Sequence, residues 1–318
     1  MNSPRRTPRG FLRLGRPEDR VPFADMTNVK DRLLARGIKP RKKWGQNFLT
    51  RPDIATRIVE ATGVTADDVV VEIGPGAGAL TGILAQRARH VVAVEFDEGL
   101  ADLLTEDLGE LSRVTIVRGD ILDVALADIC AGHGVERVTI VGNIPYSITT
   151  PILEWVIAQA AHVAGATFLV QKEYAARLAA APDTEDYGSL TVFARYSLRL
   201  EPLFHVPPSA FWPRPLVDST LLRVRFRTAP PVEVPDSDRL FEIVRAAFGQ
   251  RRKTLSNALL ALYGDDRDRV ARLLRSAHIA GNRRGETLDL EEFARIARHD
   301  PPYRDEARAE DSAPREDA

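Results

Sequence analysis

Cysteine is almost absent from this 318-residue chain, which contains Cys130 alone. A single cysteine excludes an internal disulfide, and six dispersed His without a Cys pair give no spacing typical of a metal site. No apolar run approaches the roughly 18 residues needed to span a bilayer. The first thirty residues also lack an apolar stretch that could act as a signal peptide. These absences favour a soluble protein of the cytoplasm, or of an organelle, with neither a metal centre nor a membrane partner.

Net charge is also nearly absent, at -1, but the charges are unevenly distributed. Residues 1–43 carry thirteen Lys or Arg against four acidic residues, whereas residues 303–318 carry three Arg against six acids. Both ends lack hydrophobic periodicity, so we expect a basic, flexible arm over residues 1–40 and a disordered acidic tail over residues 301–318. The arm suits a polyanionic partner such as nucleic acid. A solvated tail or a targeting presequence is the alternative.

Between these ends, short Val- and Ile-rich runs alternate with amphipathic stretches. The runs occupy residues 68–74, 90–96, 113–120, 137–143 and 166–172. They lack polar alternation, which is typical of strands buried on both faces, and helical spacing between most of them predicts a doubly wound parallel sheet. Two later β-like stretches, 189–198 and 218–226, have no comparable helix between them and predict an antiparallel pair at one edge. We therefore expect an α/β catalytic domain over residues 41–229.

The remainder of the chain has a different pattern. After the Pro-rich stretch "TAPPVEVPDS", helical periodicity over residues 238–248, 253–263, 267–277 and 288–298 predicts a small helical domain spanning 230–300. Arg251, Arg252 and Lys253 open its second helix as a basic cluster. A solvated helix end is one interpretation of this cluster, and a face that binds RNA phosphates is the other.

Three strand ends of the predicted sheet carry residues suited to an adenosine. Ligands of such sheets bind outside the carboxyl ends of the strands. The first strand ends in Gly74 of "VEIGPGAGALT", the second in Glu95 and the third in Asp120. Gly74 lets a ligand approach the backbone, Glu95 can accept both ribose hydroxyls, and Asp120 suits an adenine edge. Each acid alone could instead be a helix cap, but the set points to an adenosine-containing ligand.

The fourth strand ends in Asn143-Ile144-Pro145-Tyr146. This tetrapeptide offers an amide oxygen, a carbonyl group exposed by the fixed geometry of Pro145, and an aromatic ring, but no general base. Asn143 and the Ile144 carbonyl could accept the two N–H groups of an exocyclic amine while Tyr146 stacks on the base. A capped turn with a buried tyrosine is the alternative.

Together these motifs resemble the ribosomal RNA adenine N6-dimethyltransferase family, of the type that modifies small-subunit (16S) rRNA. The resemblance runs from about residue 42 to about residue 297. The motifs are "GQNFL", "VEIGPGAGALT", "VEFD", "GDIL", "GNIPY", "VQKEYAARL", "YGSLTV", "VPPSAFWPRPLVDS" and "FGQRRKTLSNAL". The resemblance implies a class I, Rossmann-like methyltransferase fold. It also implies an enzyme that uses S-adenosyl-L-methionine to methylate two adjacent adenosines near the 3′ end of that rRNA during ribosome biogenesis.

The resemblance also implies roles for particular residues. Asn47 and Leu49 would lie in the segment that covers the cofactor, together with Gln46. Gly74 would line its methionine and ribose, while Glu95 would hold the ribose and Asp120 the adenine. Asn143 would also contact the cofactor, between the methyl donor and the target base. The catalytic residues would be Asn143, Pro145 and Tyr146. Phe211, in a Pro-rich loop with Trp212, could stack on the other face of the substrate base, or could have a core or lid role.

Other functions are compatible with parts of this pattern. Relatives that methylate a large-subunit rRNA adenosine share the catalytic motifs, and others act as assembly or transcription factors that bind nucleic acid. An NAD-linked oxidoreductase is disfavoured because Pro75 and the G-x-G-x-G spacing depart from the dinucleotide motif. We expect a monomer that acts on small-subunit rRNA in a pre-ribosomal particle.

Overall fold

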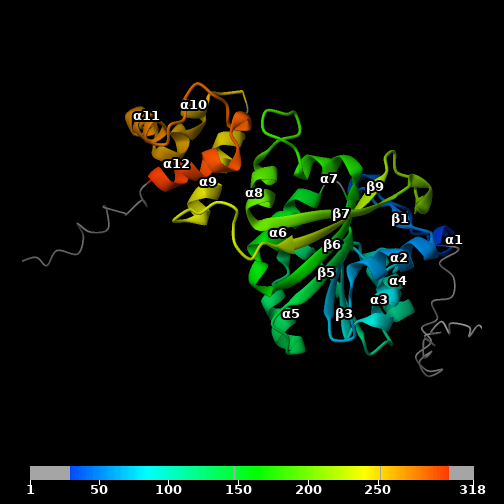
Figure 1. Cartoon of the computed structure of the whole chain (residues 1–318). Coiled ribbons are helices and arrows are strands. Elements are labelled where there is room, and N and C mark those ends of the chain that lie inside the picture. The colour runs from blue at the N-terminus through cyan, green and yellow to red at the C-terminus, as the bar shows by residue number, and fades with distance from the viewer. Residues whose placement is uncertain (1–28, 146–147, 251, 301–318) are drawn as a thin grey trace, which may run out of the picture. The chain divides into compact units, whose positions relative to one another are not determined.

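A seven-stranded sheet, in the order β4-β3-β2-β5-β6-β9-β7, organises the first part of the structure (Figure 1). The structure, a computed structural model, describes residues 29–145, 148–250 and 252–300. The strands are β2 (Val69–Ile73), β3 (His90–Glu95), β4 (Val114–Arg118), β5 (Val138–Asn143), β6 (Val163–Gln171), β7 (Leu198–Val206) and β9 (Ser219–Phe226). Strands β4, β3, β2, β5 and β6 are parallel to one another, and β9 pairs antiparallel with β6. The predicted α/β class, with a mostly parallel sheet and an antiparallel edge, is confirmed.

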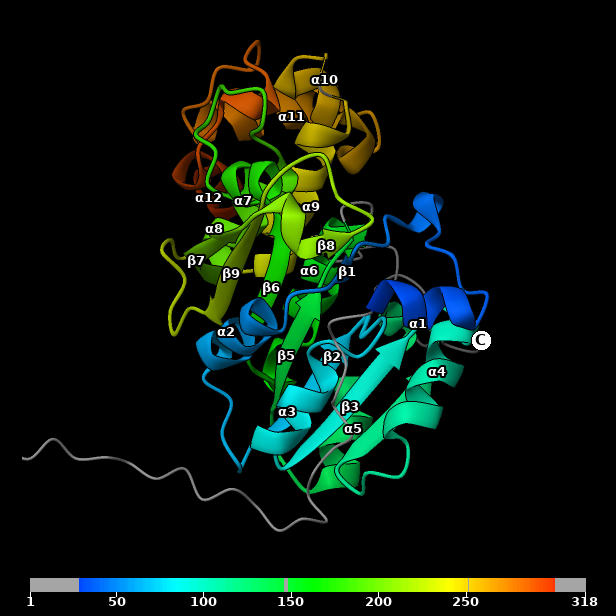
Figure 2. The same cartoon turned by 90° about the vertical axis from the view of Figure 1, so that its right-hand side faces the viewer.

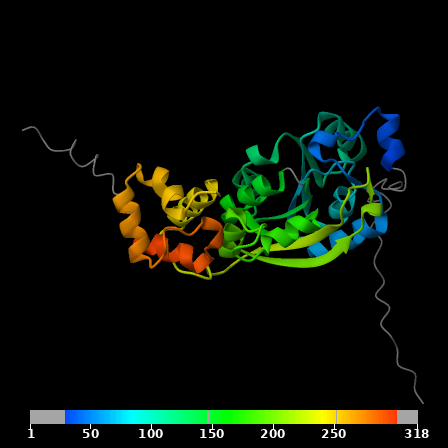
Figure 3. The same cartoon turned by 90° about the horizontal axis from the view of Figure 1, so that it is seen from above.

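One of the two stretches predicted for the antiparallel edge is confirmed, because residues 218–226 contain β9. The prediction of a strand over 189–198 is wrong, because Ser189–Ser197 form helix α8. The edge strand is the following segment, β7, which lies beside β9 (Figure 3). Pro202 inside β7 weakens its strand signal, but an edge strand tolerates proline because one side of it needs no hydrogen-bond partner.

Helices α2 (Pro52–Thr62), α3 (Thr81–Arg87) and α4 (Glu98–Leu108) contribute to one hydrophobic core with the sheet. Ile58, Leu84 and Leu104, one from each helix, are all at most 1% exposed. Helices α5 (Leu126–His133) and α6 (Thr149–Ala158) follow β4 and β5 in the chain. Because each parallel neighbour is reached through such a crossover helix, the carboxyl ends of β2 to β5 lie along one edge of the sheet.

A second, two-stranded sheet joins two distant motifs of the sequence. Strands β1 (Phe48–Leu49) and β8 (Phe211–Trp212) pair antiparallel and lie side by side (Figure 2). The pairing places Leu49 opposite Phe211, and the rings of Phe48 and Trp212 stack with centroids 6.3 Å apart. The "GQNFL" segment is thereby fixed next to the Pro-rich loop.

Helix α1 (Val29–Ala35) lies within the segment predicted as a basic arm. Val29 and Leu33 are buried and join a small hydrophobic cluster with Leu100 and Leu103 of α4. Arg32 forms an ion pair with Asp107, so part of the basic charge of this segment is paired within the protein. Residues 1–28 and the predicted acidic tail lie outside the described residues.

The chain divides into two compact units. The first comprises the described residues up to Lys172 together with Glu201–Val224, and the second comprises Glu173–Leu200 and the described residues from Arg225 onward. Helix α7 (Lys172–Leu178) falls almost entirely in the second unit. The predicted functional boundary between residues 229 and 230 stays a prediction. Among the described helices, none is both long and apolar enough to cross a membrane.

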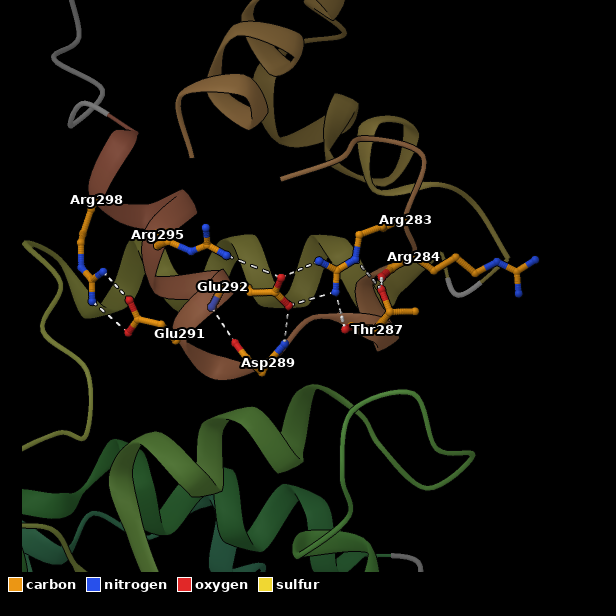
Figure 4. Close-up of polar contacts among 8 residues, drawn as sticks. All are labelled: Arg283, Arg284, Thr287, Asp289, Glu291, Glu292, Arg295 and Arg298. Carbon is orange, nitrogen blue, oxygen red and sulfur yellow. Dashed lines mark hydrogen bonds and ion pairs between the residues drawn. The ribbon is translucent and has the colours of Figure 1, made fainter. Parts of the chain in front are cut away.

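Aromatic rings pack between several helices of the second unit. Besides α7, the α-helices described in this unit are α8, α9 (Ser237–Gly249), α10 (Leu255–Leu259), α11 (Arg267–Ser276) and α12 (Leu290–His299). Phe193 of α8 contacts Phe241 of α9, with ring centroids 4.8 Å apart. The segment before α12 is held by polar contacts, in which Arg283 binds Glu292 and Arg295 also approaches that carboxylate (Figure 4).

Candidate functional site

A cavity of about 580 Å³ opens at the carboxyl ends of β2, β3, β4 and β5. Its lining includes most of the residues that the sequence indicated, which were spread over more than 160 positions: Asn47, Leu49, Gly74, Glu95, Asp120, Asn143, Pro145 and Phe211. Tyr146, the remaining predicted catalytic residue, lies outside the described residues. The cavity belongs to the first unit, and its position is the one expected for a ligand of a parallel α/β sheet.

Glu95 ends β3 and is 6% exposed. Its carboxylate accepts backbone hydrogen bonds from Gly76 and Asp97, each at 2.9 Å. Burial raises the pKa of Glu95, while these two hydrogen bonds oppose the rise. Each carboxylate oxygen keeps acceptor capacity beyond these bonds, so Glu95 is able to accept ribose hydroxyls as predicted.

The turn after β2 brings its backbone close to other parts of the site. Gly76 has a φ of +60°, and a Cβ atom there would lie 3.2 Å from the Phe48 ring. Only glycine adopts this conformation readily beside such a ring. The Gly76 N–H donates a hydrogen bond to Glu95, which links the turn to the neighbouring strand β3.

Asp120 follows β4 and caps the short helix formed by Ile121–Asp123. One oxygen, Oδ1, accepts from the Leu122 N–H at 3.0 Å. Asp120 is half-buried and lines the cavity, so its second oxygen can accept from an adenine amine. The capping role and the predicted ligand role are therefore compatible.

Asn143 ends β5 and joins the fourth strand to the "GQNFL" segment. Its Nδ2 donates to the Asn47 carbonyl at 3.0 Å. With the NH₂ group so engaged, the Asn143 Oδ1 is the atom that can accept from a ligand. Ile144 is anchored to the next strand, because its N–H donates to the Leu169 carbonyl at 3.0 Å. Pro145 and Ile144 both line the cavity.

Residues 43–47 form one wall of the cavity, and the segment 41–47 is attached to Asp97. Asp97 caps α4 through the Gly99 N–H at 3.0 Å, and it also accepts from Gln46 Nε2 at 3.3 Å. Arg41 forms an ion pair with the same carboxylate at 3.4 Å. The sequence analysis did not identify Asp97, although its position directly after the "VEF" strand end is a typical helix-capping signal.

Two aromatic rings stand at this wall. The rings of Trp44 and Phe96 meet edge to face with centroids 5.2 Å apart, and both residues line the cavity. Phe96 is 57% exposed, which is unusual for a large apolar side chain and suits a planar ligand group. The sequence analysis missed Phe96, although it follows Glu95 directly.

Glu72 is a third residue that the sequence analysis missed, after Asp97 and Phe96. It lies in β2, is 1% exposed and lines the cavity. Its Oε2 has no hydrogen-bond partner among the described residues, and neither does the hydroxyl of Thr81. Burial raises the pKa of Glu72 to about 8, and the charge of Glu95 adds to this rise. An acid inside the run "VVVEI" is a sequence signal for such a group.

Phe211 lies in β8, is 6% exposed and lines the cavity. It also belongs to the main hydrophobic core, so a packing role is present whether or not it stacks on a base. Its stacking role stays a prediction. Trp212 does not line the cavity and packs on Phe48.

The predicted RNA-binding cluster lies in the second unit. Arg252 and Lys253 are both exposed, as a phosphate-binding role requires. Arg251 lies outside the described residues. Among the described residues, no group of three or more His, Cys, Asp or Glu could hold a metal ion.

The cavity residues fit S-adenosylmethionine. Acceptors suited to adenine and ribose lie at successive strand ends, an exposed aromatic ring stands beside Glu95, and the unpartnered Glu72 carboxyl can receive positive charge. The cavity therefore contains groups that can bind the adenosine part of such a molecule and a group that can bind its cationic methionine part.

Several known proteins are similar to this chain. Residues 37–296 match the family described as ribosomal RNA adenine dimethylase. The chain is 44% identical over 277 residues to the ribosomal RNA small subunit methyltransferase A of Pelotomaculum thermopropionicum, covering 85% of this chain and 94% of that protein. It is 41% identical over 279 residues to the protein of the same name from Oceanobacillus iheyensis, covering 86% and 95%.

Two solved structures also match this chain. The crystal structure of the 23S rRNA methyltransferase ErmE matches with a TM-score of 0.56 and 31% identity, covering 79% of this chain and 98% of that one. A dimethyladenosine transferase from Plasmodium falciparum matches with a TM-score of 0.62 and 21% identity, covering 78% and 95%, and shows the shared fold.

Proposed function

Because the chain belongs to the ribosomal RNA adenine dimethylase family, we propose that it dimethylates N6 of two adjacent adenosines near the 3′ end of small-subunit (16S) rRNA. The methyl donor is S-adenosylmethionine, and the product is N6,N6-dimethyladenosine. The observation that carries this proposal is the position of Asn143, Ile144 and Pro145 on the wall of a cavity that also presents Glu95 and Asp120. An amine-binding tetrapeptide thus shares one cavity with an adenosine-binding set.

S-adenosylmethionine supplies an activated methyl group on its sulfonium. The protein's part is to orient the acceptor amine, whose nitrogen is a poor nucleophile because its lone pair is delocalised into the adenine ring. In the first transfer Asn143 Oδ1 and the Ile144 carbonyl accept the two N6 hydrogens, which favours the tetrahedral nitrogen of the transition state. In the second transfer the one remaining N6 hydrogen is shared by these acceptors. After each transfer the cationic nitrogen loses its proton to solvent. Tyr146 stacks on the base, and Pro145 fixes the backbone between them. Phe211 contributes the opposite apolar wall.

Basic residues outside this cavity bind the rRNA and hold it to the protein. Arg251, Arg252 and Lys253 bind phosphates of the folded rRNA, since A-form RNA is recognised mostly through its shape and backbone. The protein acts in the cytoplasm as a monomer on a pre-ribosomal small subunit. Identities of 41% and 44% to two small-subunit rRNA methyltransferases support this substrate over large-subunit rRNA, because the 23S rRNA methyltransferase ErmE is only 31% identical to this chain.

Tritiated methyl transfer tests the proposal. The protein should label undermethylated small subunits, and nuclease digestion should release dimethyladenosine from two adjacent positions near the 3′ end. Preferential labelling of large-subunit rRNA would contradict the substrate. RNA binding without any transfer would indicate an assembly factor instead.

Asn143→Ala tests the role of the amide. Loss of one preorganised polar contact should raise the barrier by about 2–4 kcal/mol, which is a loss of roughly 30- to 900-fold in methyl-transfer rate. The affinity for S-adenosylmethionine is measured in parallel, because Asn143 also holds the Asn47 carbonyl. A wild-type rate in the cofactor-loaded variant would show that Asn143 does not orient the amine.

A further inference from the structure

The loop between β8 and β9, residues 213–218, borders the candidate cavity. Phe211 before the loop, Pro215 within it and Ser219 at the start of β9 all line the cavity. Both ends of the loop are held by strand pairing, since β8 pairs with β1 and Ser219 of β9 pairs with Gln171 of β6. The loop is therefore fixed beside the place where a substrate base has to enter.

Leu216 in this loop is 100% exposed, more than any other exposed large apolar side chain of the described residues. Three of the other four such side chains, those of Phe96, Leu122 and Ile148, line the cavity, and Leu216 directly follows Pro215, which lines it as well. Single exposed apolar residues are common on protein surfaces, but their concentration around one cavity is typical of a binding surface.

The chemistry of the proposed substrate indicates what Leu216 contacts. An adenosine has to leave its stack in the RNA before its N6 group can reach Asn143 in the cavity. Its departure leaves a gap between the two flanking bases, and proteins that deform nucleic acids insert apolar side chains such as Leu or Phe between bases. Arg214 is also exposed, and no ion pair is described for it, so its guanidinium is available for a phosphate beside that gap.

We propose that Leu216 is a wedge that fills the gap left in the rRNA by the extruded adenosine, while Arg214 binds a neighbouring phosphate. This inference rests on the proposed function. It makes Leu216 a substrate-positioning residue, because the side chain acts on the RNA stack and not on the reacting atoms. Pro213 and Pro215 restrict the backbone on either side of Arg214, so less conformational entropy is lost when the loop engages the RNA.

Single-turnover methyl transfer by the full chain to undermethylated small subunits tests the wedge. Leu216→Ala should lower the transfer rate at saturating subunit concentration by roughly tenfold or more, since the extruded state loses the burial of one Leu side chain. The affinity for S-adenosylmethionine should not change. The affinity of the initial complex with the subunit should stay close to that of wild type, because the wedge acts only after docking.

Further variants separate an apolar wedge from a general surface effect. Leu216→Met keeps an apolar side chain of similar volume and should retain most of the rate, whereas Leu216→Gln should lose about as much as Leu216→Ala. Leu34→Ala is the matched control, because Leu34 is an exposed leucine of the same unit that does not line the cavity. Since Leu216 is fully exposed, its substitutions should leave the Tm unchanged.

A modified rRNA tests the same contact from the side of the substrate. Small subunits are reconstituted with rRNA that carries an abasic residue next to the target adenosines. Leu216 then has no base to contact on that side, so the difference in rate between wild type and Leu216→Ala should largely disappear. A difference as large as that seen with unmodified rRNA would contradict the insertion of Leu216 into the stack.

Arg214→Gln tests the phosphate contact. This variant should bind small subunits more weakly and flatten the slope of log affinity against log salt by about one unit, with the rate at saturation near that of wild type. An unchanged slope would contradict the role of Arg214.

The remaining outcomes separate the inference from the proposed function. A wild-type rate in Leu216→Ala, an equal loss in Leu34→Ala, or a Leu216→Gln variant as active as Leu216→Met would overturn the wedge and leave the proposed function intact. A loss of affinity without a loss of rate at saturation would also overturn it. A wild-type protein that transfers no methyl group to small subunits would contradict both.

Discussion

Glu72 and Glu95 lie on neighbouring strands and are both buried, but their surroundings differ. Glu95 receives two backbone N–H groups, whereas Glu72 Oε2 receives none from the described residues. Hydrogen-bond donors stabilise the charged form of Glu95 and leave it suited to neutral hydroxyls. The unpartnered Glu72 is suited to a cation instead, so two similar side chains provide two different binding properties in one cavity.

Gly142 fixes the distance between β5 and β2 next to the predicted catalytic residues. A Cβ atom at this position would lie 3.0 Å from the Ile73 carbonyl oxygen and 2.7 Å from Cδ1 of Ile144. Gly142→Ala should therefore destabilise the protein by roughly 1–3 kcal/mol, because a strand backbone cannot move aside as a side chain can. Urea denaturation followed by circular dichroism measures the loss.

Gly165→Ala is the matched control for that substitution. Gly165 lies in the same sheet, and its added Cβ atom would meet only the Val224 carbonyl, at an ordinary 3.7 Å. The control should be neutral or slightly stabilising, since glycine weakens a strand interior. Equal stabilities of the two variants would show that the close approach at Gly142 is not limiting.

Among the elements, the parallel strands and β9 could be predicted from sequence, whereas helix α8 and the outermost strand β7 could not. Runs of Val and Ile without alternation reflect burial on both faces, which is a local property of each strand. Helix α8 has a β-like composition, but Phe193 packs on Phe241 of another helix, a contact between residues far apart in the sequence. The residues of the candidate site could also be predicted where they lie at or just after the end of such a strand. The partners of Asp97 and Asn143 could not be predicted, because they lie in the distant segment 41–47.

Helix α12 is held at its start by an ion pair that responds to pH. Arg283 donates to Glu292 at 2.9 Å, and Glu292 accepts the Asp289 N–H at 3.1 Å (Figure 4). Arg283 lowers the pKa of Glu292 below its usual range. This stabilisation is present above the pKa of the unfolded chain and is lost as pH falls through the lower pKa of the folded state.

Glu292→Gln should accordingly destabilise the protein at pH 7 by roughly 1–2 kcal/mol. The difference from wild type should shrink toward pH 3, where wild-type Glu292 is itself protonated. Thermal unfolding measured across this range provides the test. Glu291→Gln is the control, because its ion pair with Arg298 is exposed and should contribute less than about 1 kcal/mol. A loss independent of pH, or equal losses in both variants, would contradict the assignment.

At the scale of the whole molecule, local ion pairing reduces the number of basic residues available to RNA. Arg32 and Arg41 come from the basic N-terminal stretch, yet each forms an ion pair with an acid next to or in α4. Arg283 of the second unit is likewise bound to Glu292. A count of Lys and Arg along the sequence therefore overestimates the charge that can contact phosphates, and exposure and pairing must decide between candidates.

Arg252 and Lys253 meet both criteria, because they are exposed and no ion pair is described for either. The double substitution Arg252→Ala with Lys253→Ala should weaken rRNA binding and flatten the slope of log affinity against log salt by about one to two units. With fewer phosphate contacts, binding of the protein releases fewer counterions from the RNA. Binding of a small-subunit rRNA fragment is measured at several salt concentrations. Arg272→Ala with Arg275→Ala removes the same charge from exposed positions of α11 in the same unit and should leave the slope nearly unchanged. Similar slopes for the two double variants would mean that the second unit attracts RNA only through its total charge, and that Arg252 and Lys253 do not form a defined phosphate contact.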